Sequence, residues 1–197
     1  MKLIALCGAA GAGKDTVADM LPARKLAFAD ALYREVAEAW GVEQHVLRCR
    51  ETKETPTALL ALAMAQSESF HAAWKRTIGG DSLDPRSPRQ ILQWWGDYRR
   101  AQDPEYFVRR AEHEITTRWH LGEDTVLTDV RFPNEAALVR QLGGQLWQIR
   151  RPGYEAGGTG HASDTDGCEF RPDVVRENFG SLDDLRRTVL DAWEYRD

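Results

Sequence analysis

The chain has 197 residues, of which 42% are hydrophobic and 29% are charged, a composition typical of a soluble globular protein with one sizeable core. Its net charge of −5 argues against broad, charge-driven binding to nucleic acid and leaves only a local basic cleft open. No apolar run approaches the roughly 18 residues of a membrane-spanning helix, and a strand begins too early for a signal peptide. The cysteines, Cys7, Cys49 and Cys168, lack metal-ligand spacing, so we expect reduced thiols in a cytoplasm.

A glycine-rich loop follows the first predicted strand, residues 3–7, and precedes a predicted helix. This order of strand, loop and helix is the context of a phosphate-binding loop. Small residues let successive backbone N–H groups surround phosphate oxygens, and Lys14 adds a charge that reaches the β- and γ-phosphates of ATP. The predicted ATP-binding residues are Gly8, Ala9, Ala10, Gly11, Ala12, Gly13, Lys14, Asp15 and Thr16. The alternative is a simple turn between strand and helix.

Asp15 occupies the position where such loops usually carry a Ser or Thr that holds Mg²⁺. A carboxylate is also a hard oxygen ligand, so we predict that Asp15 contributes to a Mg²⁺ site, directly or through a metal-bound water. The alternative is an acidic residue favoured by the positive end of the helix dipole.

The next part of the chain contains a predicted short strand at residues 25–29 and a helix at about 31–40, capped by Asp30 and ended by Gly41. From about residue 42 to 88 the sequence shows no strand pattern, but residues 57–64 and 68–74 have helical character. We therefore predict an irregular, mostly helical insertion.

Two further helices begin at Ser87-Pro88 and at Asp103-Pro104. The second helix repeats apolar residues every fourth position, which predicts one buried stripe: Phe107, Ala111, Ile115 and Trp119. A strand at 125–129, a helix at 134–142 and a strand at 145–149 follow. A glycine-rich polar loop, a strand at 174–178 and a helix capped by Ser181 complete the chain. In the last helix we expect an inward face of Leu182, Leu185, Val189 and Trp193.

Strands separated by helices predict an α/β fold with a parallel sheet of about five strands flanked by helices. We expect a single domain, residues 1–197, with a mostly helical acceptor-binding region at about 42–110 and a lid loop at about 150–168. Ligands bind at the carboxyl ends of such strands, so the phosphate loop, Asp30, Asp129 and the lid loop should meet at one rim.

The segment from Thr128 to Glu135 is the second strong signal. An apolar strand that ends in an aspartate is the arrangement with which P-loop enzymes hold Mg²⁺, so we predict Asp129 as a metal ligand. Arg131 follows at a distance suited to a bidentate phosphate contact, and Glu135 begins the next helix near the same place. The alternative is a salt-bridged turn with a helix cap.

A third cluster, predicted to bind the acceptor, begins in the helix after Ser87. Arginines suit a phosphate, Gln93 and Asp97 suit a base or sugar, and Trp94 or Trp95 suits stacking on a base. The predicted substrate-binding residues are Asp30, Arg89, Gln93, Trp94, Asp97, Arg99, Arg100, Arg131 and Glu135. The alternative is a core helix with a solvated basic end.

Arg150 and Arg151 lie at the base of the glycine-rich loop that contains His161 and Ser163. Arginines in this place suit a lid that closes over transferring phosphates, so we predict a catalytic role for both. The alternative is an ordinary surface loop with solvated charges.

These motifs, in order over nearly the whole chain, resemble the phage-type deoxynucleoside monophosphate kinases. The resemblance rests on Gly13-Lys14-Asp15-Thr16, Phe28-Ala29-Asp30, Arg89-Gln90-Ile91-Leu92-Gln93 with Gly96, Asp103-Pro104-Glu105-Tyr106-Phe107, residues 128–135, His161-Ala162-Ser163 and Asn178-Phe179-Gly180-Ser181-Leu182. In that family an aspartate also follows the loop lysine, as Asp15 does here. The family commonly has Glu after the His-Ala-Ser stretch, where this chain has Asp164.

The resemblance implies transfer of the ATP γ-phosphoryl group to a deoxynucleoside 5′-monophosphate (dNMP), with Mg²⁺, in the cytoplasm of a host if the chain is phage-encoded. We expect a small-molecule substrate and no membrane partner, and we leave a homodimer open. Two alternatives stay open: a kinase for another acceptor, such as a modified base in DNA, and an ATP-binding switch without catalysis.

Overall fold

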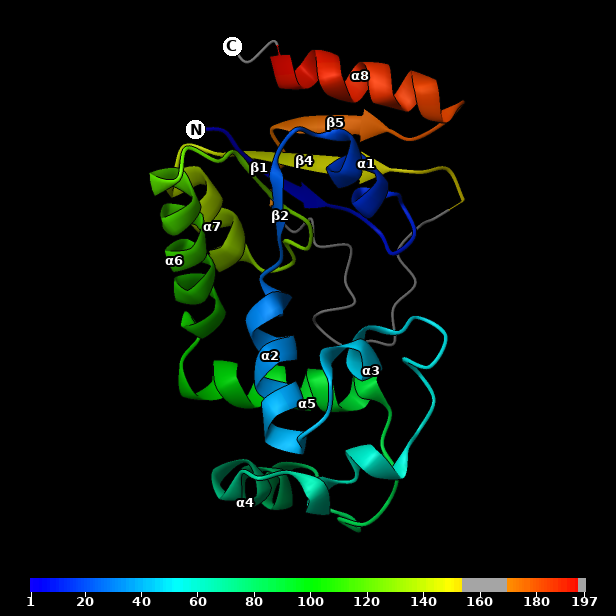
Figure 1. Ribbon diagram of the computed structural model, residues 1–197, viewed down its shortest axis with the longest axis vertical. Helices are drawn as coiled ribbons and strands as arrows, with labels where there is room; N and C mark the ends of the chain where they lie inside the picture. Colours follow the sequence, from blue (N-terminus) through cyan, green and yellow to red (C-terminus); the bar gives the residue numbers. More distant parts are fainter. Residues whose placement is uncertain (154–169, 195–197) are drawn as a thin grey trace. The chain divides into compact units, whose positions relative to one another are not determined.

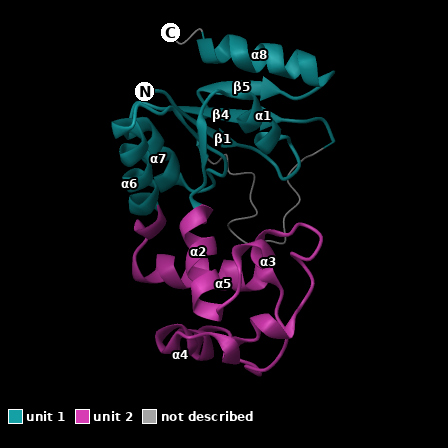
Figure 2. Cartoon of the chain, in the orientation of Figure 1, with its two compact units in different colours: residues 1–28, 108–197 teal, residues 29–107 magenta. Residues whose placement is uncertain are grey.

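The computed structural model describes residues 1–153 and 170–194 (Figure 1). The chain forms two compact units, which Figure 2 distinguishes by colour. Unit 1 consists of residues 1–28 and 108–197, and unit 2 of residues 29–107. Within the described ranges, no helix has the length and apolar character that crossing a membrane requires. The expected acceptor-binding region falls almost wholly in unit 2, which begins earlier, at residue 29.

Unit 1 contains a five-stranded sheet in the order β2-β3-β1-β4-β5, and every neighbouring pair is parallel. The strands are β1 (Leu3–Cys7), β2 (Arg24–Leu26), β3 (Thr125–Leu127), β4 (Gln145–Arg150) and β5 (Val174–Glu177). Strand β1 lies at the centre and is buried along its full length, as expected for a parallel strand covered on both faces. The predicted α/β fold with a parallel sheet is therefore confirmed.

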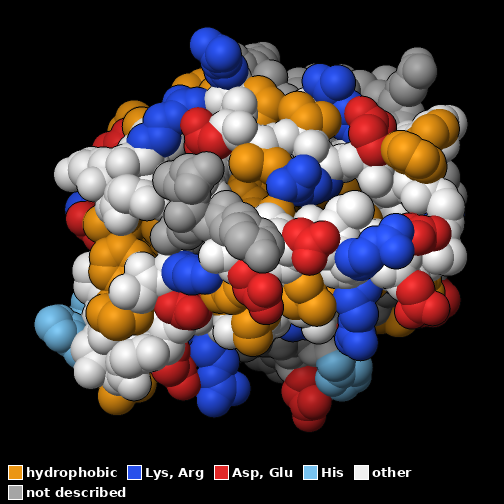
Figure 3. Space-filling view, turned by 90° about the horizontal axis from the view of Figure 1, so that it is seen from above, with side chains coloured by type: hydrophobic (Ala, Val, Ile, Leu, Met, Phe, Trp, Pro, Cys, Tyr) orange, Lys and Arg blue, Asp and Glu red, His pale blue; other side chains and the backbone are white. Residues whose placement is uncertain are grey.

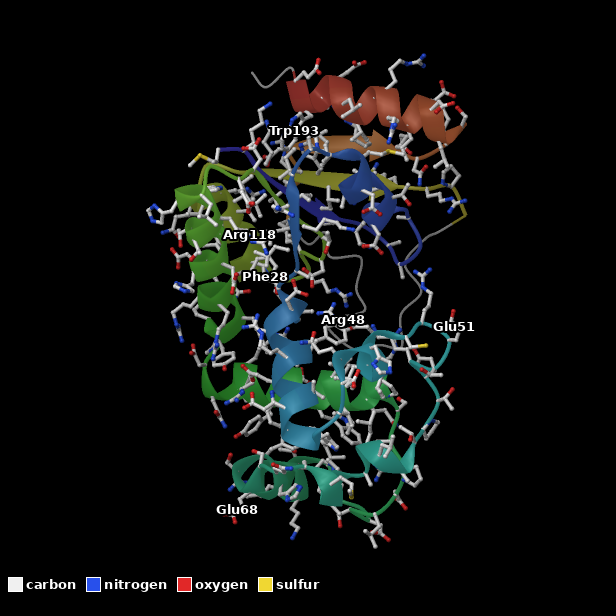
Figure 4. The ribbon with its side chains drawn as sticks, viewed as in Figure 1. Phe28, Arg48, Glu51, Glu68, Arg118 and Trp193 are labelled. Carbon is white, nitrogen blue, oxygen red and sulfur yellow. The ribbon has the colours of Figure 1, made fainter. Side chains whose placement is uncertain are left out.

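The two faces of the sheet are covered by different helices, because successive strand residues point to opposite sides. Leu3, Ala5 and Cys7 pack with apolar residues of α6 (Tyr106–His120) and α7 (Pro133–Gln141). Ile4 and Leu6 pack with residues of α1 (Lys14–Met20) and α8 (Leu182–Glu194). Figure 4 shows Trp193 pointing from α8 toward the sheet.

Unit 2 is helical in its described residues and has its own core, in which Trp40, Phe70 and Trp95 pack in edge-to-face and tilted arrangements. Its elements are α2 (Ala29–Trp40), α3 (Gln44–Arg48), the short 3₁₀ turns η1 (Ala58–Leu60) and η2 (Leu62–Met64), α4 (Glu68–Thr77) and α5 (Pro88–Gln102). Ser87 begins α5 with a capping box, in which its Oγ accepts from Gln90 N and Gln90 Oε1 accepts from Ser87 N.

Several local predictions were wrong. Strand β2 ends at Leu26, not at residue 29, because α2 begins at Ala29 and places Asp30 within its first turn. Residues 57–64 form two short 3₁₀ turns, and α3 was missed because five residues carry too little periodicity to indicate a helix. Leu182 is 66% exposed, since it begins α8, whereas Leu185, Val189 and Trp193 are buried as predicted.

Candidate phosphate-binding site

The loop after β1 is held close to β4 at its first glycine. Gly8 has φ +133°, and a Cβ atom there would lie 2.2 Å from the carbonyl oxygen of Ile149. A neighbouring backbone cannot move aside as a flexible side chain can, so only glycine fits. The start of the loop therefore takes its position from the central strands of the sheet.

Gly13 ends the loop and begins α1 in the left-handed region, with φ +100°. The main-chain N–H of Val17 donates to its carbonyl at 3.0 Å, which is the first hydrogen bond of the helix. Gly13 provides no side-chain cap, so the N–H groups of the first turn are available to an anionic ligand.

The Lys14 ammonium lies over the loop that precedes it. Its Nζ donates to the carbonyl oxygens of Gly8 at 2.7 Å and Ala9 at 2.9 Å. Burial lowers the pKa of this ammonium below its ordinary value of 10.5, and the positive charge of Arg131 lowers it further. Asp15, Cys7 and Asp129 act in the opposite direction. Two carboxylates and one guanidinium of unit 1 thus lie within electrostatic reach of Lys14.

Asp129 connects the ends of β2 and β3. Strand β3 ends at Leu127, two residues earlier than predicted, and beyond it Val130 N donates to Leu6 O. The Asp129 Oδ1 accepts from the main-chain N–H of Phe28 at 2.8 Å. Phe28, labelled in Figure 4, is 3% exposed. This contact fixes one oxygen of the carboxylate beside the strand ends, as the sequence pattern indicated.

The turn after Asp129 is organised by Glu135, which is 3% exposed. Its Oε2 accepts from the main-chain N–H of Arg131 at 2.7 Å and of Phe132 at 3.1 Å, while Pro133 opens α7. The alternative reading of a helix cap therefore accounts for Glu135, and its binding to a substrate stays a prediction. The same contact fixes the backbone of Arg131, whose side chain is exposed.

Arg150 ends β4, and its Nε donates to Gln148 Oε1 at 2.9 Å. Arg151 follows immediately and is exposed. The remainder of the predicted lid loop, with His161, Ser163 and Asp164, lies outside the described residues. A catalytic role for Arg150 and Arg151 therefore stays a prediction.

In unit 2, Asp30 accepts from Arg48 Nη2 at 2.8 Å, and Arg89 Nε is paired with Glu54. The predicted acceptor residues of α5 are distributed around the helix. Trp94 is displaced by roughly 140° from Arg89 and roughly 120° from Arg100 at 100° per residue. They therefore do not all lie on one face of the helix, and their binding to an acceptor stays a prediction.

Part of α5 builds an internal polar centre around Glu35 of α2. The Glu35 carboxylate accepts from Trp95 Nε1 at 3.0 Å, from Arg99 Nε at 2.8 Å and from the Tyr106 hydroxyl. Burial alone would raise the pKa of Glu35, but these hydrogen bonds outweigh burial and lower it. Trp95 is only 3% exposed, which does not fit stacking on a base, and Arg99 is engaged in this centre.

Trp94 and Asp97 instead line a pocket of about 650 Å³ between α4 and α5. Phe70, Trp74 and Tyr98 form its apolar wall. Asp97 is also within 4.0 Å of Arg100. Arg100 lies on the same side of α5 as Arg89, which we call the arginine side. Gln93 is half-buried, between these two sides. The sequence does not show this division, because spacings of three and four residues do not indicate which helices pack beside α5.

Among the described residues, no three His, Cys, Asp or Glu side chains form a metal cluster. Mg²⁺ in nucleotide-dependent enzymes is usually held by one or two carboxylates together with phosphate oxygens. Asp15, which is exposed in the first turn of α1, and Asp129 are hard oxygen donors of the required kind. The residues present therefore fit a Mg²⁺ ion that is bound together with a nucleotide.

Unit 1 thus combines a parallel α/β sheet with a glycine-dependent loop after its central strand, a lysine that follows the loop and an aspartate beyond the neighbouring strand. This order of strand, loop and helix is the context of a phosphate-binding loop. No family model matches the chain. It is 28% identical over 208 residues to a protein of Acanthamoeba polyphaga mimivirus named "Putative deoxynucleotide monophosphate kinase", and the match covers 96% of this chain and 95% of the relative. The resemblance to deoxynucleotide monophosphate kinases is thus confirmed.

Two other similarities are more limited. A protein of Ictalurid herpesvirus 1 (strain Auburn), "Uncharacterized protein ORF77", is 32% identical over 117 residues, which are 56% of this chain and 51% of that protein. The match thus spans about half the length of this relative. A solved structure, "Crystal structure of TT1252 from Thermus thermophilus", aligns over 98% of this chain and 96% of that chain with a TM-score of 0.49 and 20% identity.

Proposed function

We propose that this protein is a nucleotide kinase that transfers the γ-phosphoryl group of ATP to a deoxynucleoside 5′-monophosphate. The observation that carries the proposal is the geometry of the loop: Lys14 Nζ lies against the carbonyl oxygens of Gly8 and Ala9, and Arg131, Asp15 and Asp129 lie within electrostatic reach of it in unit 1. A loop lysine, an arginine and carboxylates that can hold Mg²⁺ recur in enzymes that transfer phosphoryl groups. The name of the mimivirus relative supports the same activity.

In the proposed reaction, an oxygen of the acceptor phosphate forms a bond to the γ-phosphorus of ATP, while the bond from that phosphorus to the β–γ bridging oxygen breaks. The products are a deoxynucleoside diphosphate and ADP. Such an acceptor needs little deprotonation, so the protein acts by positioning the phosphates and neutralising their charge. Mg²⁺, when bound, would neutralise the β- and γ-phosphates.

Each group of unit 1 then has a defined task. The loop amides and Lys14 hold the ATP phosphates, for which Lys14 exchanges its contacts with the Gly8 and Ala9 carbonyls for phosphate oxygens. Asp15 or Asp129 holds Mg²⁺. Arg131 binds the acceptor phosphate bidentately.

An assay of ADP formation by the purified protein tests the proposal, with ATP and Mg²⁺ and with each of four dNMPs, four ribonucleoside monophosphates, duplex DNA or no acceptor. We expect ADP to form rapidly only when a nucleoside monophosphate is added, and with dNMPs in particular. If ADP formed only with duplex DNA, the acceptor would be a base in DNA and not a free dNMP. On the face seen in Figure 3, positive and negative side chains are interspersed, which offers DNA no continuous basic strip there.

A further inference from the structure

Asn178 follows the last strand of the sheet and reaches back to the phosphate loop. Its side-chain Nδ2 donates to the carbonyl oxygen of Ala12 at 2.8 Å, and its main-chain N–H donates to the carbonyl of Arg150 at 2.6 Å. One residue thus links three segments that are distant in sequence: the phosphate loop, the end of β4 and the end of β5.

The amide of Asn178 also occupies the space beside Gly13. A Cβ atom at position 13 would lie 2.4 Å from Asn178 Nδ2. The φ of +100° favours glycine at position 13, and a Cβ atom there would also displace the Asn178 side chain from its present place. The loop and Asn178 fit each other as a pair.

The hydrogen bond to Ala12 determines the orientation of the next amide. The Ala12 carbonyl and the Gly13 N–H belong to one planar trans peptide unit, so they point in opposite directions. When Asn178 holds the carbonyl on its own side, it holds the Gly13 N–H on the other side. The amides of such a loop are the groups that bind phosphate oxygens.

We propose that Asn178 is a positioning residue for the ATP phosphates, which acts by fixing the Ala12–Gly13 peptide so that the Gly13 N–H faces the phosphate. The inference rests on the proposed function and extends it to a residue that does not itself bind the transferred group. Its side chain recognises no base, so its effect is the same for every nucleoside triphosphate.

The position of Asn178 is fixed from both sides. On one side, β5 pairs with β4, with Glu177 opposite Arg150. On the other, Ser181 caps α8, since its Oγ accepts from Asp184 N at 3.1 Å. Helix α8 in turn packs with residues of α1 in one apolar cluster. Asn178 therefore belongs to the same packed unit as the phosphate loop that it orients.

The test compares three ligands that share a triphosphate: ATP, GTP and inorganic tripolyphosphate. Their dissociation constants are measured by calorimetry for the wild type, Asn178→Leu and Asn178→Asp, together with the KM for ATP and for dNMP. Leucine keeps the approximate shape of asparagine without the donor, and aspartate keeps its size but places an acceptor against the Ala12 carbonyl. The control is Thr188→Ala, which removes a hydrogen bond to the Leu185 carbonyl in the middle of α8 without touching the loop or Asn178.

We expect Asn178→Leu to weaken all three ligands by a similar factor, about 3- to 10-fold for one lost hydrogen bond, with the KM for dNMP changed less than twofold. Asn178→Asp should weaken them at least as much and serves as the decisive variant if leucine prevents folding. Thr188→Ala should leave the three dissociation constants unchanged.

Weaker binding of ATP with unchanged binding of tripolyphosphate would overturn the inference, because it would make Asn178 a contact to the nucleoside. Unchanged binding of all three ligands with a lower melting temperature would also overturn it and leave a structural role, while the proposed function would stand. If the wild type bound none of the three ligands, the proposed function itself would fail, and the inference with it.

Discussion

The phosphate loop and helix α5 use their residues in different ways. In the loop, the proposed function assigns binding to the backbone, and the residues between Gly8 and Gly13 are small. In α5, the polar side chains that suggest a ligand also hold unit 2 together: Trp95 and Arg99 bind Glu35, and Arg89 pairs with Glu54. A site built from main-chain groups is recognisable from the glycines that it needs, whereas side chains of α5 serve packing and binding alike.

The largest effect expected in the loop is that of Lys14→Met. Removing a preorganised charge at the phosphates should lower turnover by about 10²-fold or more. Because burial lowers the pKa of Lys14, its charge costs stability below the folded pKa, and this cost disappears above the ordinary value of 10.5. Methionine has no such cost, so the melting temperature at neutral pH should not fall.

The matched control for this prediction is Lys25→Met, since Lys25 is exposed and paired with Asp19. Its turnover should equal that of the wild type. Near-normal turnover of Lys14→Met, measured by ADP release, would contradict the proposed kinase function and the proposed difference between the loop and α5.

Arg131→Ala examines the border between donor and acceptor. Loss of a charge-assisted phosphate contact is worth roughly 1.5–3 kcal/mol, so the KM for dNMP should rise about 10- to 100-fold while the KM for ATP changes much less. Arg140→Ala, at the other end of α7, should change neither constant. If Arg131→Ala weakens ATP alone, Arg131 belongs to the donor side.

The sequence allowed the α/β fold and the phosphate loop to be predicted, since both depend on local patterns. A buried strand, two glycines and a lysine are adjacent in the chain, and the parallel sheet follows from alternating strands and helices. The cap formed by Glu135 was open as an alternative from the sequence, because a Glu at the third helical position is a known capping residue.

The remaining features depend on contacts between distant segments. Nothing near Glu35 in the sequence indicates that it meets Trp95, Arg99 and Tyr106, which are 60 to 71 residues away. Asn178 lies 166 residues from Ala12, and its stretch of sequence contributed to the family resemblance without indicating this contact. Tertiary packing, not local propensity, decides which polar side chains stay available to a ligand.

Glu35→Gln removes the negative charge that accepts hydrogen bonds from Trp95 and Arg99, so it should destabilise unit 2. Hydrogen bonds to a charged group are worth about 1.5–3 kcal/mol, so the free energy of unfolding at pH 7 should fall by about 1–3 kcal/mol. Because the pKa of Glu35 is lowered, its contribution is complete above the ordinary value of 4.5 and is lost as the pH falls through the folded pKa.

Denaturant titrations of the wild type and Glu35→Gln at pH 7 and at pH 3 to 4 measure this difference directly. The gap between the two proteins should narrow at the lower pH. The control is Glu38→Gln, at an exposed position of the same helix, which should match the wild type throughout. A gap that is independent of pH would show that the Glu35 charge does not stabilise unit 2.

The smallest effects are expected from two single changes on opposite sides of α5, Arg89→Ala and Trp94→Leu. If the acceptor binds on the arginine side, Arg89→Ala should raise the KM for dNMP about 3- to 10-fold. The effect is modest because Arg89 is also paired with Glu54, which weakens its contact with a ligand. Trp94→Leu, on the pocket side, should change that KM less than twofold, since Trp94 is turned by roughly 140° from Arg89. Titration of both variants with each dNMP, with ATP saturating, gives the two constants under the same conditions.

The reverse order, with Trp94→Leu the more damaging, would place the acceptor in the α4–α5 pocket and return Trp94 to the role of a stacking residue. Equal losses accompanied by equal falls in melting temperature would instead show that both residues serve only the packing of unit 2, so that α5 would hold no acceptor contact at either position.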